Sequence, residues 1–295
     1  MQDDTSYEET LKAIAGKVSS GGCILFLGAG IHCPSPPNAT LSYAEPICPP
    51  LGAGLARMMD VETHFSKRFP KEGLGNLQRV AMDYEIKKQN RGPLIQLIRA
   101  AVHNGKQPSP LLLLLASLPF SIIITTNYDQ LLEQALSIVG KQPVKSIYKP
   151  SYNAPERADP YPDGEPTPQQ PFVLKMHGDI DKPESIVITD DDYIRFVSRM
   201  CAPGGFHPIP LAIQYHLATK PMLFIGYSLM DFNLRTLFMT LRWSLDQAFI
   251  PASYSVDPSP DKLAVAVYQN KHGYLQYIVK DAWNFVPDLH REVKT

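Results

Sequence analysis

The sequence predicts an α/β protein with a mainly parallel sheet flanked by helices and a helical insert after the first strand. Short apolar runs at 23–27, 120–124 and 222–225 alternate with longer stretches of helical periodicity, which is typical of strand–helix–strand units. The runs are apolar at nearly every position, as expected for parallel strands that are covered on both faces. Helical periodicity at 53–117 separates the first two strands, so this segment is expected to form a subdomain beside the sheet.

The composition allows one large core. The chain has 295 residues, of which 44% are hydrophobic and 19% charged, and its formal net charge is −1. Because α/β domains of this size often fold as one unit, a single domain over 1–295 is expected. A nearly neutral chain lacks the basic balance of a nucleic-acid-binding protein, and no direct nucleic-acid contact is expected.

The individual elements follow from periodicity and from the residues that break it. Helices are expected at 6–18, 53–68, 74–89, 92–103, 109–117, 128–138, from about Thr189, and at about 208–218. Strands are expected at 23–27, 120–124, 172–176, 185–188, 222–225, 263–267 and 275–279.

Two proline-dense segments are expected to be loops, because proline fixes φ and lacks an N–H group. The segment 31–50 follows a glycine turn directly, and it is either a lid over a ligand or a proline-stiffened structural loop. The segment 149–171 is expected to be a solvated excursion or a contact between subunits.

The chain is expected to be soluble and to act in a reducing cytoplasm. The N-terminal "MQDDTSYEET" is acidic and polar, unlike a secretory signal. The most apolar run, 111–126, contains Pro119 and is too short to span a bilayer, so no membrane contact is expected. The four cysteines, which lie far apart without a C-x-x-C pair, predict reduced thiols and no zinc site: Cys23, Cys33, Cys48 and Cys201.

Four apolar strands end in polar or glycine-rich turns, "LGAG", "TTNYD", "MHGD" and "IGYSLMD". In an open α/β sheet, ligands bind beyond the carboxyl ends of the strands, so the four turns are expected to converge on one site. Each turn alone also has a structural explanation. These explanations are a tight turn for Gly28 and Gly30, helix caps for Thr126, Asn127, Ser228 and Asp231, and a core position for His177. The coincidence of all four turns favours a ligand site.

At these turns the sequence resembles the sirtuin-like superfamily. Sirtuins have, in order, a GAG-x-S turn, a T-Q-N-x-D turn, an HG pair and a G-T-S-like turn, which correspond here to "GAGIH", "TTNYD", "HGD" and "GYS". The pattern is most similar to bacterial sirtuin-like domains of antiphage defence, as is the stretch from Asp192 and Tyr193 to Phe196. The resemblance implies a Rossmann-like fold that binds NAD.

The resemblance also implies roles for residues that match its motifs. Asn127 and His177 would be catalytic, with Asn127 and Asp129 holding the nicotinamide ribose and a water, and His177 acting as general base. The residues implied in NAD binding are Gly28, Ala29, Gly30, His32, Thr126, Asp129, Gly226, Ser228 and Asp231.

Within that set, the three residues 28–30 would cradle the pyrophosphate, because backbone N–H groups can approach where Cβ is missing. Gly226 and Ser228 would line the adenosine side. Asp231 is expected either to bind a ribose or to cap its helix.

The chain departs from sirtuins in ways that argue against protein deacylation. His32 stands where sirtuins carry Ser, the D-F-R segment is absent, and no four-cysteine zinc module follows the HG pair. Without acyl-lysine, water takes the ADP-ribose, so the expected reaction is NAD hydrolysis to ADP-ribose and nicotinamide. The alternatives are a non-catalytic sensor of NAD or ADP-ribose and, less favoured, an NAD-dependent deacylase.

An NAD hydrolase has to be held in check in the cell that makes it. Because the motifs extend over most of the chain, control is expected from self-association into a homo-oligomer, from a defence partner such as an ATPase, or from both. The expected role is that of a conditional NAD-depleting effector of antiphage defence.

Overall fold

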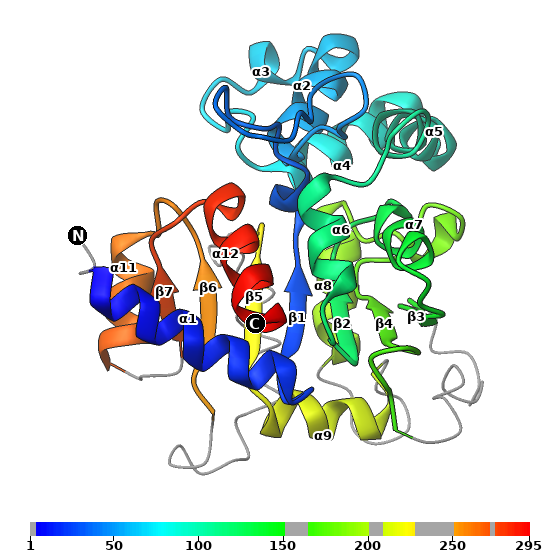
Figure 1. Ribbon diagram of the computed structural model, residues 1–295. Helices are drawn as coiled ribbons and strands as arrows, with labels where there is room; N and C mark the ends of the chain where they lie inside the picture. Colours follow the sequence, from blue (N-terminus) through cyan, green and yellow to red (C-terminus); the bar gives the residue numbers. More distant parts are fainter. Residues whose placement is uncertain (1–3, 151–164, 201–208, 228–250, 272–274) are drawn as a thin grey trace.

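The protein is organised around one all-parallel sheet whose strand order is β3-β4-β2-β1-β5-β6-β7 (Figure 1). The computed structural model describes residues 4–150, 165–200, 209–227, 251–271 and 275–295. The strands are β1 (Ile24–Leu27), β2 (Ile122–Thr125), β3 (Val144–Ile147), β4 (Phe172–Lys175), β5 (Met222–Ile225), β6 (Ser253–Val256) and β7 (Leu275–Ile278). This sheet confirms the predicted α/β, Rossmann-like class.

Helices cover both faces of the sheet and give three layers. One face carries α1 (Asp4–Ser19), α6 (Pro110–Ser117), α7 (Leu131–Ile138) and α12 (Ala282–Lys294). The other carries α8 (Asp190–Met200), α9 (Leu211–Thr219), α11 (Lys262–Ala264) and the π-helix η5 (Val265–Lys271). None of the helices in these described ranges is both long and apolar enough to cross a bilayer.

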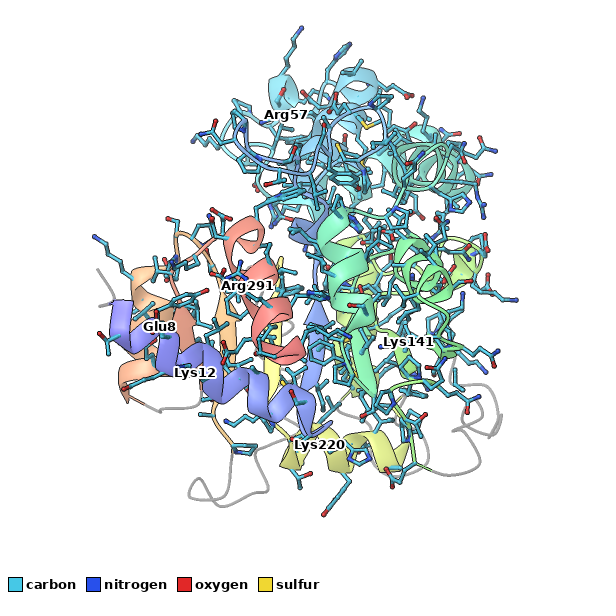
Figure 2. All side chains as sticks on the ribbon, viewed as in Figure 1. Glu8, Lys12, Arg57, Lys141, Lys220 and Arg291 are labelled. Atoms are coloured by element: carbon cyan, nitrogen blue, oxygen red, sulfur yellow. The ribbon has the colours of Figure 1, made fainter. Side chains whose placement is uncertain are left out.

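Alternation along the strands divides the core between the two faces. In β1, Leu25 and Leu27 pack on the face of α1 and α12, whereas Ile24 and Phe26 pack on the face of α8 and α9. The helices are correspondingly amphipathic. On α1, Glu8 and Lys12 project outward (Figure 2), because the helix turns its apolar side to the sheet.

The insert forms a second core beyond the carboxyl ends of the strands (Figure 1). Its helices are α2 (Gly52–Thr63), α3 (Phe65–Arg68), α4 (Leu77–Lys88) and α5 (Arg91–Val102). Helix α6, which the sequence groups with the insert, instead packs on the sheet against α7 and α12. Ile180, Ile186 and Ile188 from the segment after β4 join the core of the insert.

Two predicted strands are wrong. The segment 185–188 is not a strand: the 3-10 helix η2 (Pro183–Ser185) leads into buried residues outside the sheet, which point alternately into the insert and into the sheet core. The segment 263–267 is helical, because the Asp261 carboxylate accepts the Ala264 N–H at 2.8 Å and caps α11. Its apolar side chains Ala264, Val265 and Tyr268 then share one helical face against the sheet core.

Strands β3 and β6 were not predicted. In β6, Ser253 and Ser255 are buried, and polar residues at these positions conceal the apolar pattern of a strand. The Ser253 hydroxyl is satisfied by the Met222 N–H at 3.0 Å. In β3 only the Ser146 side chain is fully buried, as expected for an edge strand.

Candidate functional site

A cavity of about 390 Å³ lies between the carboxyl ends of the strands and the helical insert. Strand β1 is flanked by β2 and β5, and the chain winds outward in opposite directions from this point. Such a switch point is where ligands bind in open α/β sheets, and the volume lies within the usual range for ligand sites. Seven of the sequence-predicted site residues line the cavity: Ala29, His32, Thr126, Asn127, Asp129, His177 and Gly226.

In the turn after β2, Thr126 and Asn127 do not cap the following helix. Helix α7 begins only at Leu131, and the side chain that receives the Leu131 N–H is that of Asp129, at 2.9 Å. Asn127 instead points toward the β1 turn, with its Nδ2 3.4 Å from the Gly28 carbonyl oxygen and 3.3 Å from His32 Nε2. The cap explanation for Thr126 and Asn127 is therefore wrong, because both precede the helix start by several residues.

His32 joins the β1 and β2 turns. Its Nε2 lies 3.5 Å from Asp129 Oδ2, and the two residues are only 2% and 4% exposed. Burial alone would raise the pKa of Asp129, but His32, Lys175 and the Leu131 N–H together hold that pKa below its ordinary value. His32 Nδ1 is buried and has no hydrogen-bond partner among the described residues.

His177 follows β4 and also lines the cavity. Its ring contacts Tyr193 and Phe196 edge-on, and its Nδ1 lies 3.5 Å from the Tyr193 hydroxyl. The residue is 5% exposed, so its ring orientation is fixed by these aromatic neighbours. It lines the cavity, and its role as general base stays a prediction.

The glycines of the β1 turn are required by its packing against the β5 turn. The Gly28 N–H donates to the Ile225 carbonyl at 3.0 Å, and the Gly30 N–H donates to the Gly226 carbonyl at 2.7 Å. A Cβ at residue 28 would lie 2.4 Å from the Gly226 oxygen, and one at residue 30 would lie 2.8 Å from the Gly226 Cα. Both amides are occupied here, and the role of these glycines toward pyrophosphate stays a prediction.

Two predicted site residues, Ser228 and Asp231, lie outside the described residues. Their roles in ligand binding or helix capping therefore stay predictions.

The second residue of the HG pair has a structural function. Gly178 has φ +90°, and a Cβ there would lie 2.2 Å from the Ser185 carbonyl oxygen. Only glycine fits this close turn without strain. The turn places His177 at the cavity and Asp179 in the interior, where Asp179 is fully buried.

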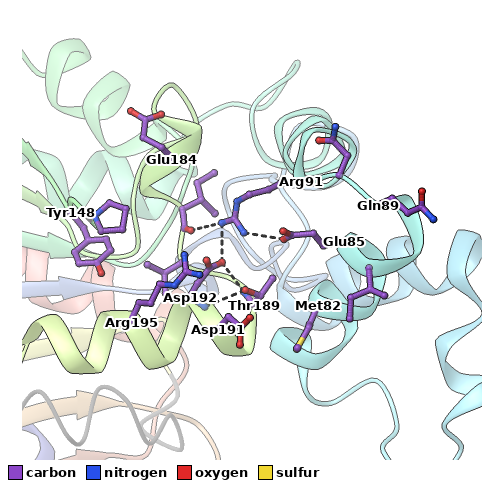
Figure 3. Close-up of a pocket in the computed structure, with 15 residues that line it drawn as sticks. Met82, Glu85, Gln89, Arg91, Tyr148, Glu184, Thr189, Asp191, Asp192 and Arg195 are labelled. Atoms are coloured by element: carbon purple, nitrogen blue, oxygen red, sulfur yellow. Dashed lines mark hydrogen bonds and ion pairs between the residues drawn. The ribbon is translucent and has the colours of Figure 1, made fainter. Parts of the chain in front are cut away.

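The segment 180–192 follows the HG pair. Two arginines of α5 in the insert bind this segment near its two ends. Arg99 donates to the Ile180 carbonyl at 2.6 Å, whereas Arg91 donates to the Ile186 carbonyl at 2.7 Å and to Asp192 at 2.9 Å (Figure 3). A second cavity of about 520 Å³ lies beside Arg91, between α4 and α8. None of the sequence-predicted site residues lines it.

The 31–50 loop is attached to the insert along its length. The buried Tyr43 donates its hydroxyl to the Gln107 carbonyl at 2.9 Å, and Lys106 donates to the Pro46 and Cys48 carbonyls. Pro49 and Pro50 line the candidate site. These contacts favour the interpretation of 31–50 as a proline-stiffened structural loop over its interpretation as a lid.

The sequence did not identify the remaining cavity wall. Tyr227 and Tyr193 line the cavity from the β5 turn and α8, and Gln78 and Leu77 line it from α4. Of these residues, the sequence pointed only to Tyr193, which belongs to the stretch that resembles bacterial sirtuin-like defence domains. The insert residues carry no motif, because their place at the site is set by tertiary packing.

In the described ranges, no group of three or more His, Cys, Asp or Glu side chains is placed to hold a metal ion. Cys23, Cys33 and Cys48 are free thiols, and burial raises the pKa of the Cys23 thiol to about 12. The fourth cysteine, Cys201, lies outside the described residues.

The fold and cavity define a class: doubly wound α/β proteins whose ligand site lies at the switch point of the sheet. The SIR2-like domain profile matches residues 121–277, more than half of the chain. The chain belongs to the SIR2-like domain family, which confirms the resemblance seen in its motifs.

Several curated proteins are similar to the chain. NAD(+) hydrolase ThsA of Acinetobacter baumannii is 28% identical over 79% of this chain and 42% of its own length, and ThsA of Enterococcus faecium is 28% identical over 80% and 43%. Defense-associated sirtuin 2 of Bacillus subtilis is 29% identical over 51% of this chain and 14% of its own length. The chain thus spans less than half the length of these relatives.

Proposed function

We propose that the chain is an NAD hydrolase that cleaves the nicotinamide–ribose bond and releases nicotinamide and ADP-ribose. The observation that carries the proposal is that Asn127 and His177, from turns far apart in the sequence, line one cavity at the switch point of the sheet. The names of the ThsA relatives support the same reaction.

The reaction breaks the bond from ribose C1′ to the nicotinamide nitrogen, and the bonding electrons leave with the nicotinamide. The resulting transition state has oxocarbenium character, as in glycoside hydrolysis. In our proposal, the ionised Asp129 provides negative charge near this developing positive charge. The Asn127 amide holds a ribose hydroxyl or the attacking water, since it offers both a donor and an acceptor.

Water then forms the new bond to C1′, and His177 takes the proton that this water loses. A positioned histidine base contributes roughly 10²–10⁴-fold to such a step. His32, with one buried ring nitrogen unpartnered, is assigned to the phosphate or ribose of NAD. Gly28, Ala29, Gly30, Thr126 and Gly226 are assigned to the wall that the dinucleotide contacts, and Ser228 and Asp231 to its adenosine side.

We further propose that hydrolysis is conditional and serves antiphage defence. Support comes from the name of the defence-associated relative and from the cost of uncontrolled NAD loss to a cell. Control by a homo-oligomer, by a partner such as an ATPase, or by both is part of this proposal. We expect the chain to act in the cytoplasm, where its substrate is found.

Nicotinamide release from NAD by the purified chain, measured with and without an acetylated peptide, tests the reaction. Asn127→Ala and His177→Ala should each lower turnover by at least about 10²-fold. Matched controls are Asn104→Ala and His64→Asn, both at exposed positions; asparagine is chosen because residue 64 has φ 54°. Near-normal turnover of either site variant would refute its role. NAD binding without release would indicate the sensor, and peptide-dependent acetyl loss the deacylase.

A further inference from the structure

A buried lysine connects the two turns that carry Asn127 and His177. Lys175 is the last residue of β4, and its side chain is 0% exposed. Such a residue is rarely buried without partners, because removing an ammonium group from water is costly. The partners of this lysine therefore indicate its function.

Strand geometry directs Lys175 toward the start of α7. Lys175 and Val173 lie on the same face of β4, and Val173 packs in the core beneath α6 and α7. In the parallel register, Lys175 stands beside Thr125, the last residue of β2. The side chain therefore passes under the turn that follows β2.

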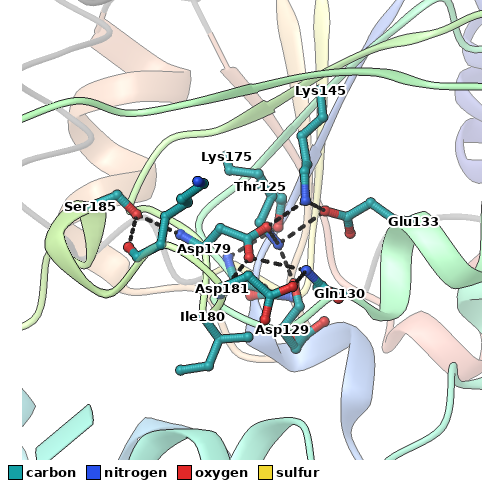
Figure 4. Close-up of polar contacts among 12 residues, drawn as sticks. Thr125, Asp129, Gln130, Glu133, Lys145, Lys175, Asp179, Ile180, Asp181 and Ser185 are labelled. Atoms are coloured by element: carbon teal, nitrogen blue, oxygen red, sulfur yellow. Dashed lines mark hydrogen bonds and ion pairs between the residues drawn. The ribbon is translucent and has the colours of Figure 1, made fainter.

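The ammonium group of Lys175 contacts both motif turns at once (Figure 4). It donates to the main-chain carbonyl of Asp129 in the "TTNYD" turn. It also lies 3.6 Å from the Asp179 carboxylate in the "HGD" turn and 3.5 Å from the carboxylate of Glu133 on α7. This cation thus adds a connection between the turn of Asn127 and the turn of His177. The two turns are also joined by the Ile180 N–H, which donates to the Tyr128 carbonyl at 2.9 Å, and by the Gln130 amide, which donates to Asp179 Oδ1 at 3.3 Å.

Asp179, the partner of Lys175 in the "HGD" turn, is itself held by hydrogen bonds within that turn. Its Oδ1 accepts the Asp181 N–H at 2.9 Å, and its N–H donates to the Ser185 hydroxyl at 3.0 Å. Burial opposes ionisation, but Lys175, the Asp181 N–H and Lys145 hold the pKa of Asp179 below its ordinary value. The carboxylate is therefore charged when it pairs with the lysine.

We propose that Lys175 is a positioning residue, which sets the distance between Asn127 and His177 by holding the Asp129 carbonyl and the Asp179 carboxylate together. The lysine lines no part of the cavity and touches no reacting atom. Its kinetic consequences rest on the proposed NAD hydrolysis, whereas its structural consequences do not.

The cluster itself contains a matched control. Lys145 on β3 pairs with the same two carboxylates, at 2.9 Å from Asp179 and 3.5 Å from Glu133. No contact between Lys145 and the Asp129 carbonyl occurs in the described structure, where that carbonyl receives Lys175. Lys145→Met and Lys175→Met therefore each remove one positive charge from the same cluster, and only the second removes the lysine contact with the Asp129 carbonyl of the "TTNYD" turn.

The first measurement is hydrogen–deuterium exchange of the full chain without ligand, followed in peptides that contain 126–130 and 177–181. Lys175→Met should accelerate exchange in both peptides, while a peptide containing β1 stays unchanged. Lys145→Met should leave 126–130 unchanged. Unchanged exchange in both turns of Lys175→Met, or equal acceleration at 126–130 in Lys145→Met, would overturn the proposal.

The second measurement is the pH dependence of nicotinamide release. Lys175→Met should lower kcat by roughly 10–100-fold with a smaller change in KM, because a misplacement near 1 Å costs up to about 10²-fold. The acidic limb of its profile should move to higher pH, since Lys175 favours the ionised form of Asp129. Lys145→Met should keep kcat within about twofold. An unshifted limb with normal kcat in Lys175→Met would contradict positioning.

A further variant serves if Lys175→Met does not fold. Asp179→Asn keeps the hold of Lys175 on Asp129 and removes the charge at the other end. The Gln130 amide, 3.3 Å from Asp179 Oδ1, can still donate to the asparagine oxygen, so exchange should rise much more at 177–181 than at 126–130. Equal changes in both peptides, or none, would overturn the proposal. If the unaltered chain releases no nicotinamide under any condition, the proposed function fails, and the exchange measurements still decide the positioning role.

Discussion

The imidazole of His32 and the carboxylate of Asp129 lie 3.5 Å apart in a nearly solvent-free wall of the candidate site. The pair connects the first turn of the sheet to the second, and Asn127 contacts the same imidazole nitrogen at 3.3 Å. The sirtuin motif that the sequence resembles has serine at the position of His32, so this contact could not be predicted from the motif.

Replacement of His32 by alanine tests this relationship. Loss of the imidazole should raise the pKa of Asp129 and move the acidic limb of nicotinamide release to higher pH. The KM for NAD should rise by about tenfold or more, since hydrogen bonds to charged groups contribute roughly 1.5–3 kcal/mol. Steady-state kinetics from pH 4 to pH 9 measure both effects, with His64→Asn as the control. An unchanged KM and pH profile would exclude His32 from the site.

Gly178→Ala should destabilise the fold and abolish nicotinamide release. A side chain at φ +90° costs about 1–3 kcal/mol, and the close Ser185 carbonyl adds a steric penalty. Gly73→Ala is the control, because Gly73 also has positive φ but has open space where its Cβ would be. Urea unfolding should show the larger loss for Gly178→Ala. Equal losses of unfolding free energy in the two variants would mean that the Ser185 carbonyl moves away from the new side chain without destabilising the fold.

Stability should fall in acid because Asp129 and Asp179 have lowered pKa values. Their contribution is complete above the ordinary aspartate pKa of about 3.9 and is lost as pH falls through the lower folded-state values. The free energy of unfolding, measured in urea from pH 7 to pH 3, should therefore decline below about pH 4.

Asp179→Asn should be less stable by about 3–5 kcal/mol at pH 7, because the buried Lys175 loses a charged partner, and its stability should depend less on pH in acid. Asp191→Asn, at an exposed position, is the control. A variant with the same acid slope as the unaltered chain would show that Asp179 does not titrate with folding.

The purified chain should contain no stoichiometric zinc and should not couple NAD consumption to deacetylation. Tetrahedral structural zinc needs four nearby ligands, and the cysteine spacing does not supply a C-x-x-C pair. Metal analysis by mass spectrometry and thermal unfolding with and without a chelator measure the first point. Acetyl release from a peptide together with NAD loss would contradict the second.

Activity should depend on assembly. We expect light scattering to detect self-association and NAD depletion to rise with protein concentration or with an added partner, because binding can shift the population toward a competent site. A monomer that depletes NAD at full rate, unaffected by concentration or partner, would contradict conditional control.

Much of the sheet could be predicted because its central strands are uniformly apolar. The runs that became β1, β2 and β5 are buried on both faces and contain no competing polar pattern. Strand β6 was not predicted because Ser253 breaks the apolar pattern of the sequence. This serine is tolerated in the core because its hydroxyl accepts the Met222 N–H. The prediction of a strand at 263–267 was wrong. The apolar run fits either a strand or a helix, and the Asp261 side chain caps a helix there by accepting the Ala264 N–H.

Those residues of the candidate site that directly follow a strand could be predicted from the sequence. Parallel strands bring their carboxyl ends to one edge, and this rule alone brings Asn127 near His177. Gln78 and Leu77 could not be predicted, because they reach the cavity through the packing of the insert. The role proposed for Lys175 could not be predicted either, since its partners come from α7 and from the turns after β2 and β4.

The interlocked turns of β1 and β5 also constrain how this protein can be varied or recombined. Gly30 and Gly226 come from opposite halves of the chain, yet each occupies the space that a side chain on the other would need. A chimera that takes its first half from one homologue and its second half from another would have to inherit a matched pair of turns. In a mutational library, neither position should accept a side chain, alone or together, because each added Cβ meets the backbone of the other turn.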